Sequence, residues 1–400
     1  MPTSMNILFF HRFGINPTAG GVSQITYVLS QEFQKQGYNV FFLGLQKVES
    51  VTYQEHQYFL PVENRLLSDE NVDYLIRFCS EYHIDSIINQ NALSLESAEF
   101  VSRVNGVYKI SVIHNCIFTQ YRNLAFQYEY RLKSHHRGWF FNLAKCTPVR
   151  GMITLIYILR FAKYYNQIAD NCDVMSVMSQ GQVDDLKIIL NKSKWNKIVL
   201  IPNCINPKTF EWKPRSKNVL WVATIDFKIK RVDLMLKIWK LVQDNHSEWN
   251  LRILGDSSNY DEAKKYAEEL GVKNVIFEGR VNPEAYYLDA QIACVTSTHE
   301  SFSMVLIESF KYGVVPMAFD SFPAANEIIN NGQDGVTVPA FDIKQYAAKL
   351  GNLMDDEIER ERMRSNAYKS AKKYYSTNVF EKWSCLLLKA VPEKKEYDKQ

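Results

Sequence analysis

The chain has 400 residues, of which 46% are hydrophobic and 23% are charged. This is the composition of an ordinary globular protein, and it excludes a disordered chain, a collagen and a coiled-coil array. At roughly 150 residues per domain, the length predicts two or three domains. The formal net charge of +3 is too small to indicate a nucleic-acid partner by itself. Aromatic residues are the unusual feature, because they make up 13% of the chain.

Cysteine usage and hydropathy indicate a cytoplasmic protein. The seven cysteines are scattered without a C-x-x-C pair, which favours reduced thiols over a disulfide framework or a zinc site. The apolar run near the N-terminus is too short for a secretory signal. The longest other apolar run, residues 151–159, ends at Arg160 and is well short of the ~20 residues that span a bilayer. We therefore expect contact with a membrane at most from its surface.

The predicted elements begin with a strand, a helix and a second strand. Residues 5–11 form a buried strand pattern, the next helix ends at Gly37, and residues 38–45 form the second strand. Strands joined through a helix pair in parallel. Apolar runs and helical patterns alternate along the rest of the chain, which predicts an α/β fold with parallel sheets. The further strands are expected at 83–90, 107–115, 172–179, 197–203, 218–224, 249–255, 274–279, 292–297 and 314–319, and helices at 231–243, 259–270 and 303–312.

A polar segment with two prolines, residues 204–217, separates two series of strands and helices. We therefore predict an N-terminal doubly wound domain over residues 1–205 and a C-terminal one over residues 206–377. A terminal helix with a charged tail is expected over residues 378–400.

The stretch 297–319 carries the clearest chemical pattern. Glu300 follows a predicted strand, and Glu308 lies within the next predicted helix. The first amides of that helix, at Ser303, Met304 and Val305, lack helical partners and lie at the positive end of the helix dipole, where phosphate binds without a metal. A carboxylate on each side of such a site can hold hydroxyls of a sugar and of a ribose.

This stretch resembles the E-x7-E region of retaining GT-B glycosyltransferases, specifically the large family four of nucleotide-sugar-dependent enzymes. The resemblance covers most of the chain, and the order of the motifs makes it specific. The glycine pair Gly20 and Gly21 is expected to bind the donor, because a backbone without side chains can approach phosphate or sugar closely. The other matching pieces are Gly20 and Gly21 before the first helix, His114 at a strand end, and the segments 201–210, 251–257, 275–281 and 327–339.

The resemblance implies two Rossmann-like domains facing a cleft, with a nucleotide sugar held mainly by the C-terminal domain. Position by position, it implies that Glu308 binds the ribose and that Glu300 contacts hydroxyls of the donor sugar near the reacting centre. Lys230 matches the lysine that neutralises the departing pyrophosphate. His114 matches the histidine close to the transferred sugar.

The chain departs from the family pattern at the pyrophosphate site. An arginine normally stands six positions before the lysine, and here that position is Thr224. One cation is therefore missing unless Lys228 or Arg231 substitutes for it. The chain has no D-x-D motif. We therefore predict transfer without a metal or another cofactor, in which Lys230 and the helix terminus meet the charge of the diphosphate.

No carboxylate nucleophile can be identified, so we hypothesise a front-face mechanism in which the departing phosphate takes the proton of the acceptor hydroxyl. Two alternatives stay open on the same scaffold. One is a nucleotide-sugar epimerase, and the other is a degenerate nucleotide-sugar-binding protein, which Thr224 motivates. A phosphorylase is disfavoured because no cofactor-lysine region is evident, and a dehydrogenase because the first loop lacks G-x-G-x-x-G.

Residues 131–165 contain seven Lys or Arg, two His and no acidic residue. Basic and aromatic residues around an apolar centre are typical of a segment in a membrane interface, where anionic lipid attracts each Lys or Arg by about 1 kcal/mol. That interpretation predicts a lipid-linked saccharide acceptor in surface polysaccharide or glycolipid assembly. The alternative is a core-packing helix pair with a solvated basic rim, and no nucleic-acid motif accompanies the segment. Its aromatic residues are Trp139, Phe140, Phe141, Tyr157, Phe161, Tyr164 and Tyr165.

Overall fold

The computed structural model describes residues 5–17, 20–48, 53, 55–134, 142 and 145–390. Its contacts divide the chain into two compact units. Unit 1 contains Met1–Asn115, Ile158–Asn206 and Tyr374–Gln400, and unit 2 contains Cys116–Tyr157 and Pro207–Lys373.

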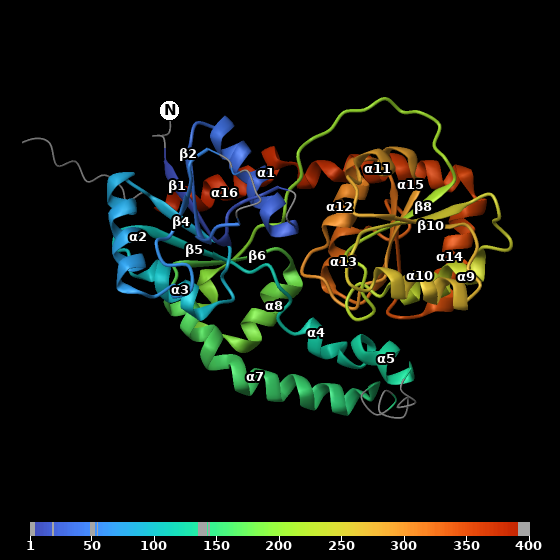
Figure 1. Ribbon diagram of the computed structural model, residues 1–400, viewed down its shortest axis with the longest axis horizontal. Helices are drawn as coiled ribbons and strands as arrows, with labels where there is room; N and C mark the ends of the chain where they lie inside the picture. The colour runs from blue at the N-terminus through green and yellow to red at the C-terminus, as the bar shows by residue number, and fades with distance from the viewer. Residues whose placement is uncertain are drawn as a thin grey trace, which may run out of the picture. The chain divides into compact units, whose positions relative to one another are not determined.

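Unit 1 is built on a seven-stranded parallel sheet in the order β3-β2-β1-β4-β5-β6-β7 (Figure 1). Helices pack against the sheet, and β1 is consequently apolar at four successive buried positions, Ile7 to Phe10. The strands are β1 (Asn6–Phe13), β2 (Asn39–Gln46), β3 (Gln57–Phe59), β4 (Ser86–Asn89), β5 (Tyr108–Val112), β6 (Val174–Val177) and β7 (Ile198–Leu200). The helices are α1 (Gly21–Lys35), α2 (Asp69–Glu81), α3 (Leu95–Ser102), α8 (Gln180–Ile189) and α16 (Ser376–Leu387).

Unit 2 is built on a six-stranded parallel sheet in the order β10-β9-β8-β11-β12-β13. Its core includes three tryptophans that are almost completely buried, Trp221, Trp239 and Trp249. The strands are β8 (Asn218–Val222), β9 (Asn250–Leu254), β10 (Val275–Gly279), β11 (Ile292–Val295), β12 (Val315–Asp320) and β13 (Val336–Pro339). The helices are α9 (Val232–Val242), α10 (Tyr260–Glu269), α11 (Glu284–Asp289), α12 (Met304–Lys311), α13 (Pro323–Ile328), α14 (Ile343–Asp355) and α15 (Glu357–Ser370).

The predicted α/β class with parallel sheets is confirmed, and each predicted strand corresponds to a strand of the structure. Two further strands, β3 and β13, were not predicted. Each has only three or four residues and pairs at the edge of its sheet, so a short apolar run is all the signal it leaves.

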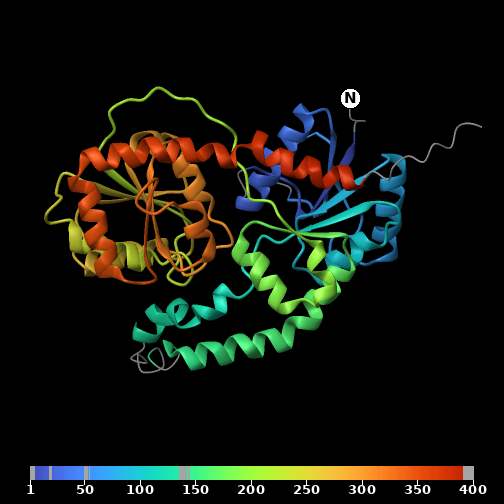
Figure 2. The same ribbon diagram turned by 180° about the vertical axis from the view of Figure 1, so that it is seen from behind.

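The sequence predicts that the domain changes once, near residue 206. The contacts instead group one segment before that boundary with unit 2 and one segment after it with unit 1. Residues 116–157, here called the inserted segment, group with unit 2 although they lie between β5 and β6 of unit 1. They include α4 (Thr119–Arg122), α5 (Leu124–Ser134) and the start of α7 (Thr147–Asp170). In both views these three helices lie side by side (Figures 1 and 2). Residues 374–400 return to unit 1, where the Phe380 ring contacts Phe33 at 5.4 Å between centroids.

Gly255, directly after β9, occupies a position that tolerates no side chain. Its φ is 144°, and an added Cβ would lie 1.8 Å from the carbonyl oxygen of Ala223. We expect Gly255→Ala to lower the free energy of unfolding by about 3 kcal/mol, because the backbone has to move.

Gly271→Ala is the matched control, measured by the same urea unfolding curves. Gly271 also has a positive φ, 62°, but an added Cβ would meet only Lys240 Nζ at 3.5 Å. This variant should lose about 1 kcal/mol. Equal losses for the two variants would contradict the close approach at Gly255.

Candidate active site

One carboxylate shapes the loop between β8 and α9. Asp226 Oδ1 accepts hydrogen bonds from the backbone amides of residues 228, 229 and 230, with N–O distances of 2.7 Å to Lys228 and 3.1 Å to Lys230. The amide of Val232 donates to the carbonyl oxygen of Asp226. The backbone of Lys230 is therefore fixed just before α9 begins.

Lys230 and Glu300 form an ion pair between two loops of unit 2. Lys230 Nζ lies 2.6 Å from Glu300 Oε1, and Ser297 Oγ donates to the same oxygen at 2.7 Å. The side chains of Lys230 and Glu300 are 28% and 14% exposed. The loops are also joined through their backbones, because Thr298 N donates to Ile229 O at 2.7 Å. Two residues that the sequence places 70 positions apart thus meet at the carboxyl edge of the sheet.

The amino terminus of α12 lies three residues beyond Glu300. Ser303 is the N-cap, with φ 78° and ψ 94°, and its side chain makes no capping hydrogen bond. Among the described residues, its Oγ is one of the few buried polar atoms without a hydrogen-bond partner. Leaving such a group unpaired costs about 1–3 kcal/mol. The following amides, at Met304 and Val305, have no acceptor within the helix. This terminus therefore offers a hydroxyl and several N–H groups to an anion.

Glu308 lies on the same helix, beside a pair of tyrosines. Tyr287 OH donates to Glu308 Oε2 at 3.2 Å, and the Tyr287 ring stacks on Tyr312 with a centroid distance of 5.4 Å. Burial first, and then the charge of Glu308, raises the pKa of Tyr287 well above its ordinary value. Tyr287 therefore stays protonated and donates. Arg215 supports the pair by donating to the carbonyl oxygens of both tyrosines.

His114 follows β5 in unit 1 and is a neutral side chain at physiological pH. Its Nε2 lies 2.5 Å from Oε1 of Gln90, so Nε2 carries the proton and Nδ1 is left as an acceptor. Burial of the ring lowers the pKa of His114 to about 3, and the neighbouring His11 adds a smaller effect in the same direction. The ring can hold a hydrogen bond, but it does not titrate near pH 7.

The glycine pair lies at the amino terminus of α1, beside a cavity of about 470 Å³. Gly20 has φ 131°, a conformation that side chains rarely adopt. Apart from their own chain neighbours, no atom of the described residues lies within 4 Å of the position that a Cβ would take at either glycine. The cavity is lined by His11, Phe13, Gly14, Asn16, Gly20, Gly21, Val22, Ser23, Val48 and Tyr53.

The predicted site residues thus fall into two groups. Lys230, Glu300, residues 303–305 and Glu308 gather at the loops and the helix that follow β8 and β11 in unit 2. His114 and the glycine pair belong to unit 1. Their catalytic and binding roles stay predictions.

The structure excludes one of the two cations suggested as substitutes for the missing arginine. Arg231 is completely buried, and its Nε lies 2.8 Å from Asp233 and its Nη2 3.0 Å from Glu129. It is therefore committed to its own carboxylates. Lys228 is exposed, and its Nζ lies over the Tyr128 ring at 4.9 Å.

Several residues that shape this site are not among those predicted from the sequence. Asp226 carries a signal that could have been used, because an aspartate often caps the amides that follow it in a turn. Ser297 stands only three positions before its partner Glu300, whereas the partners of Tyr287 and Asn123 lie 21 or more positions away and leave no local signal. In the part of the chain that the structure describes, no group of three or more His, Cys, Asp and Glu side chains is arranged to hold a metal ion.

Comparisons with known proteins agree with this geometry. Residues 205–370 match the family model described as glycosyl transferases group 1. A Haemophilus influenzae protein named as an uncharacterized glycosyltransferase is 22% identical over 381 residues, which cover 92% of this chain and 97% of that protein. A Campylobacter jejuni N-acetyl-D-galactosaminyltransferase is 27% identical over 224 residues, 54% of this chain and 60% of that enzyme. The crystal structure of Anabaena HepE in complex with UDP-glucose has a TM-score of 0.71 at 13% identity, and the match covers 96% of this chain and all of HepE.

Two α/β units, each built on a parallel sheet, are the architecture of GT-B glycosyltransferases, and the likeness to HepE is a likeness of this fold. The match to glycosyl transferases group 1 covers residues 205–370, and a relative that spans most of the chain is named a glycosyltransferase. The predicted fold class and enzyme class are confirmed.

The pKa of His114 leads to a test by pH. Between pH 6.5 and about 3, the unfolded chain protonates this ring whereas the folded protein does not. Stability should therefore fall as pH decreases through this range. We expect His114→Asn to lose less thermal stability than the wild type between about pH 7 and about pH 4.

His83→Asn is the control for this measurement, because asparagine tolerates the left-handed conformation of His83. Its pH dependence should follow that of the wild type. A His114 ring that titrates near pH 6.5 in an NMR experiment would contradict the account.

Proposed function

We propose that the protein transfers a sugar from a uridine diphosphate sugar to a lipid-linked saccharide, with retention at the anomeric carbon. The observation that carries the proposal is the Lys230–Glu300 pair beside the open amino terminus of α12. The UDP-glucose in the HepE structure supports the donor class. The name of the Campylobacter jejuni enzyme, which specifies a PP-undecaprenol-linked saccharide, supports the acceptor class.

The diphosphate is assigned to Lys230, Ser303 Oγ and the first amides of α12. These groups supply one cation, one unpaired hydroxyl and a helix terminus, which together suit a doubly charged anion. In this arrangement Glu308 holds the ribose and Glu300 holds hydroxyls of the sugar. The terminus of α12 compensates for the arginine that Thr224 replaces. No metal or other cofactor has a role in this proposal.

The reaction follows a front-face course. The bond between the anomeric carbon and the diphosphate oxygen breaks, and the acceptor oxygen bonds to the same face of that carbon. The acceptor proton passes to the departing phosphate, so the products are the glycosylated acceptor and UDP. Lys230 and the α12 amides stabilise the charge that develops on the leaving group. Trapping of a covalent glycosyl-enzyme would contradict this course. The names of the relatives favour transfer over epimerisation.

Replacing Lys230 tests the assignment of the diphosphate. We expect transfer from a UDP-sugar by the wild type and a fall in kcat of about 10²–10³ in Lys230→Ala, because leaving-group stabilisation is lost. Initial rates are measured as UDP release. Lys217→Ala is the control, since Lys217 forms a half-exposed ion pair with Glu248 at 3.1 Å.

Two results would count against the donor site. One is a kcat for Lys230→Ala close to that of the Lys217→Ala control. The other is a thermal unfolding midpoint of the wild type that no UDP or UDP-sugar shifts.

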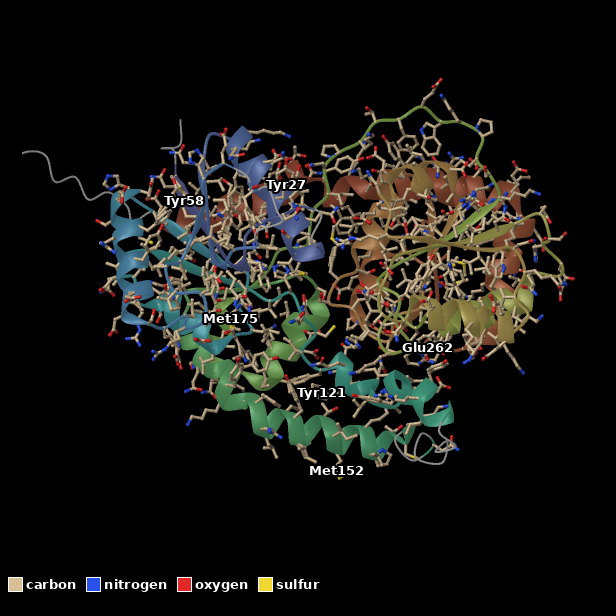
Figure 3. The ribbon with its side chains drawn as sticks, in the orientation of Figure 1. Tyr27, Tyr58, Tyr121, Met152, Met175 and Glu262 are labelled. Atoms are coloured by element: carbon tan, nitrogen blue, oxygen red, sulfur yellow. The ribbon has the colours of Figure 1, made fainter. Side chains whose placement is uncertain are left out.

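The membrane contact of residues 131–165 is proposed for one face of α7. Four apolar side chains, Met152, Leu155, Ile156 and Leu159, are 56%, 55%, 55% and 73% exposed and follow the spacing of one helix face. Figure 3 shows Met152 pointing away from α4 and α5. No helix in the described ranges is both long and apolar enough to cross a bilayer. We therefore propose a cytoplasmic protein that lies on the inner face of the membrane, with this stripe in contact with lipid.

The aromatic residues of this segment do not all support the contact. Tyr157 and Tyr165 are buried, and Tyr164 OH donates to Leu93 O at 2.6 Å, so these rings pack inward. Three others, Trp139, Phe140 and Phe141, lie outside the described residues. The apolar stripe and the basic residues Arg160 and Lys163, rather than the aromatic rings, carry the membrane proposal.

Vesicle binding tests the stripe. We expect the triple change Leu155→Ser, Ile156→Ser and Leu159→Ser to reduce co-sedimentation with vesicles containing phosphatidylglycerol by about tenfold or more, because roughly 0.8 kcal/mol is lost per CH₂ withdrawn from lipid. The double change Ile188→Ser and Ile358→Ser is the control, since these residues are 54% and 86% exposed elsewhere. Equal binding by both variants would remove the stripe from the account.

A further inference from the structure

Asn123, between α4 and α5, bridges two loops of the unit 2 sheet. Its Nδ2 donates to Thr298 O and to Ser321 O, each at 2.7 Å, so both amide hydrogens are used. The side chain is buried, with only 6% of the residue exposed. The two acceptors follow β11 and β12, adjacent strands of the sheet. A residue of the inserted segment thus fixes the distance between two loop backbones.

One of these loops carries Glu300. Ser297 Oγ donates to Glu300 Oε1 at 2.7 Å, and Ser321 Oγ donates to Ser297 O at 2.6 Å. Asn123 therefore bonds to Ser321, whose hydroxyl holds the backbone of Ser297, and Ser297 in turn holds the Glu300 carboxylate. Its other acceptor, Thr298 O, lies in the loop that carries Glu300. A displacement at Asn123 is passed to the Glu300 carboxylate through these bonds.

The inserted segment also contacts the loop that carries Lys230. Arg231 is left-handed, with φ 56°, and its guanidinium donates to Phe126 O and to Glu129 of α5. The Phe126 ring stacks on Phe341 with a centroid distance of 3.9 Å. The segment is thus held at two points, beside Lys230 through Arg231 and beside Glu300 through Asn123.

We propose that Asn123 is a positioning residue for sugar transfer, which holds Glu300 where it meets the donor sugar. This inference rests on the proposed role of Glu300. The physical reason is that buried hydrogen bonds fix the loop to within tenths of an ångström, and a misplacement of about 1 Å at a reacting centre can cost about 10²-fold in rate. The inserted segment becomes part of the site through Asn123.

Asn123→Asp tests this inference with little change in shape, because a carboxylate would face two carbonyl oxygens without a hydrogen to donate. We expect kcat with a UDP-sugar to fall by about 10²-fold, whereas Kd for UDP itself changes less than about threefold, since UDP lacks the sugar that Glu300 contacts. A merely structural role would weaken UDP binding and thermal stability together. Asn123→Ala should show the same split with a smaller loss.

The matched control is Asn274→Asp. Asn274 Nδ2 also donates to a loop carbonyl, Ser247 O, at 2.7 Å, but far along the chain from both site loops. It should leave kcat unchanged.

Hydrogen exchange followed by mass spectrometry gives a readout that does not depend on activity. The peptide covering residues 297–303 should exchange faster in Asn123→Asp than in the wild type and the control. Unchanged exchange in that peptide, or equal losses of UDP binding and kcat, would overturn the inference. Absence of transfer by the wild type would instead reject the proposed function, and the exchange result would still decide whether Asn123 positions the loop.

Discussion

The site depends on the contact between Lys230 and Glu300, a cation and a carboxylate 2.6 Å apart and largely screened from water. Withdrawing two such charges from solvent is costly, and their attraction with the added hydrogen bond from Ser297 offsets that cost. In the proposed function, a diphosphate competes with Glu300 for Lys230, and the released carboxylate then accepts hydrogen bonds from sugar hydroxyls.

The backbone around this contact is held from several sides. Asp226 fixes the Lys230 loop, Thr298 joins that loop to the Glu300 loop, and Asn123 adds a bridge from the inserted segment. The same segment begins α7, where Arg150 Nε donates to Arg122 O at 2.6 Å, directly before Asn123 in the chain. The helix that carries the apolar stripe and the loop that carries Glu300 therefore belong to one hydrogen-bonded set.

The parts of the structure that the sequence predicts are those with a repeating apolar pattern. The alternating runs predict both parallel sheets, and the start of α12 between Glu300 and Glu308 follows from the position of a strand and a helix. The inserted segment could not be assigned to unit 2 in this way, because its contacts join residues more than 100 positions apart, as in the bonds of Asn123. Of the two cations that the sequence offers in place of the missing arginine, Lys228 and Arg231, the second is buried against Asp233 and Glu129. Its contact with Glu129 joins residues 102 positions apart, so the local sequence does not predict it.

A crystal structure of the full chain with bound UDP would test the central claim most directly. The account predicts that a phosphate oxygen lies within hydrogen-bond distance of Lys230 Nζ and of Ser303 Oγ, and that Lys230 no longer contacts Glu300. The ribose should lie beside Glu308. A UDP molecule bound elsewhere, or one bound here while the Lys230–Glu300 pair stays intact, would contradict the account.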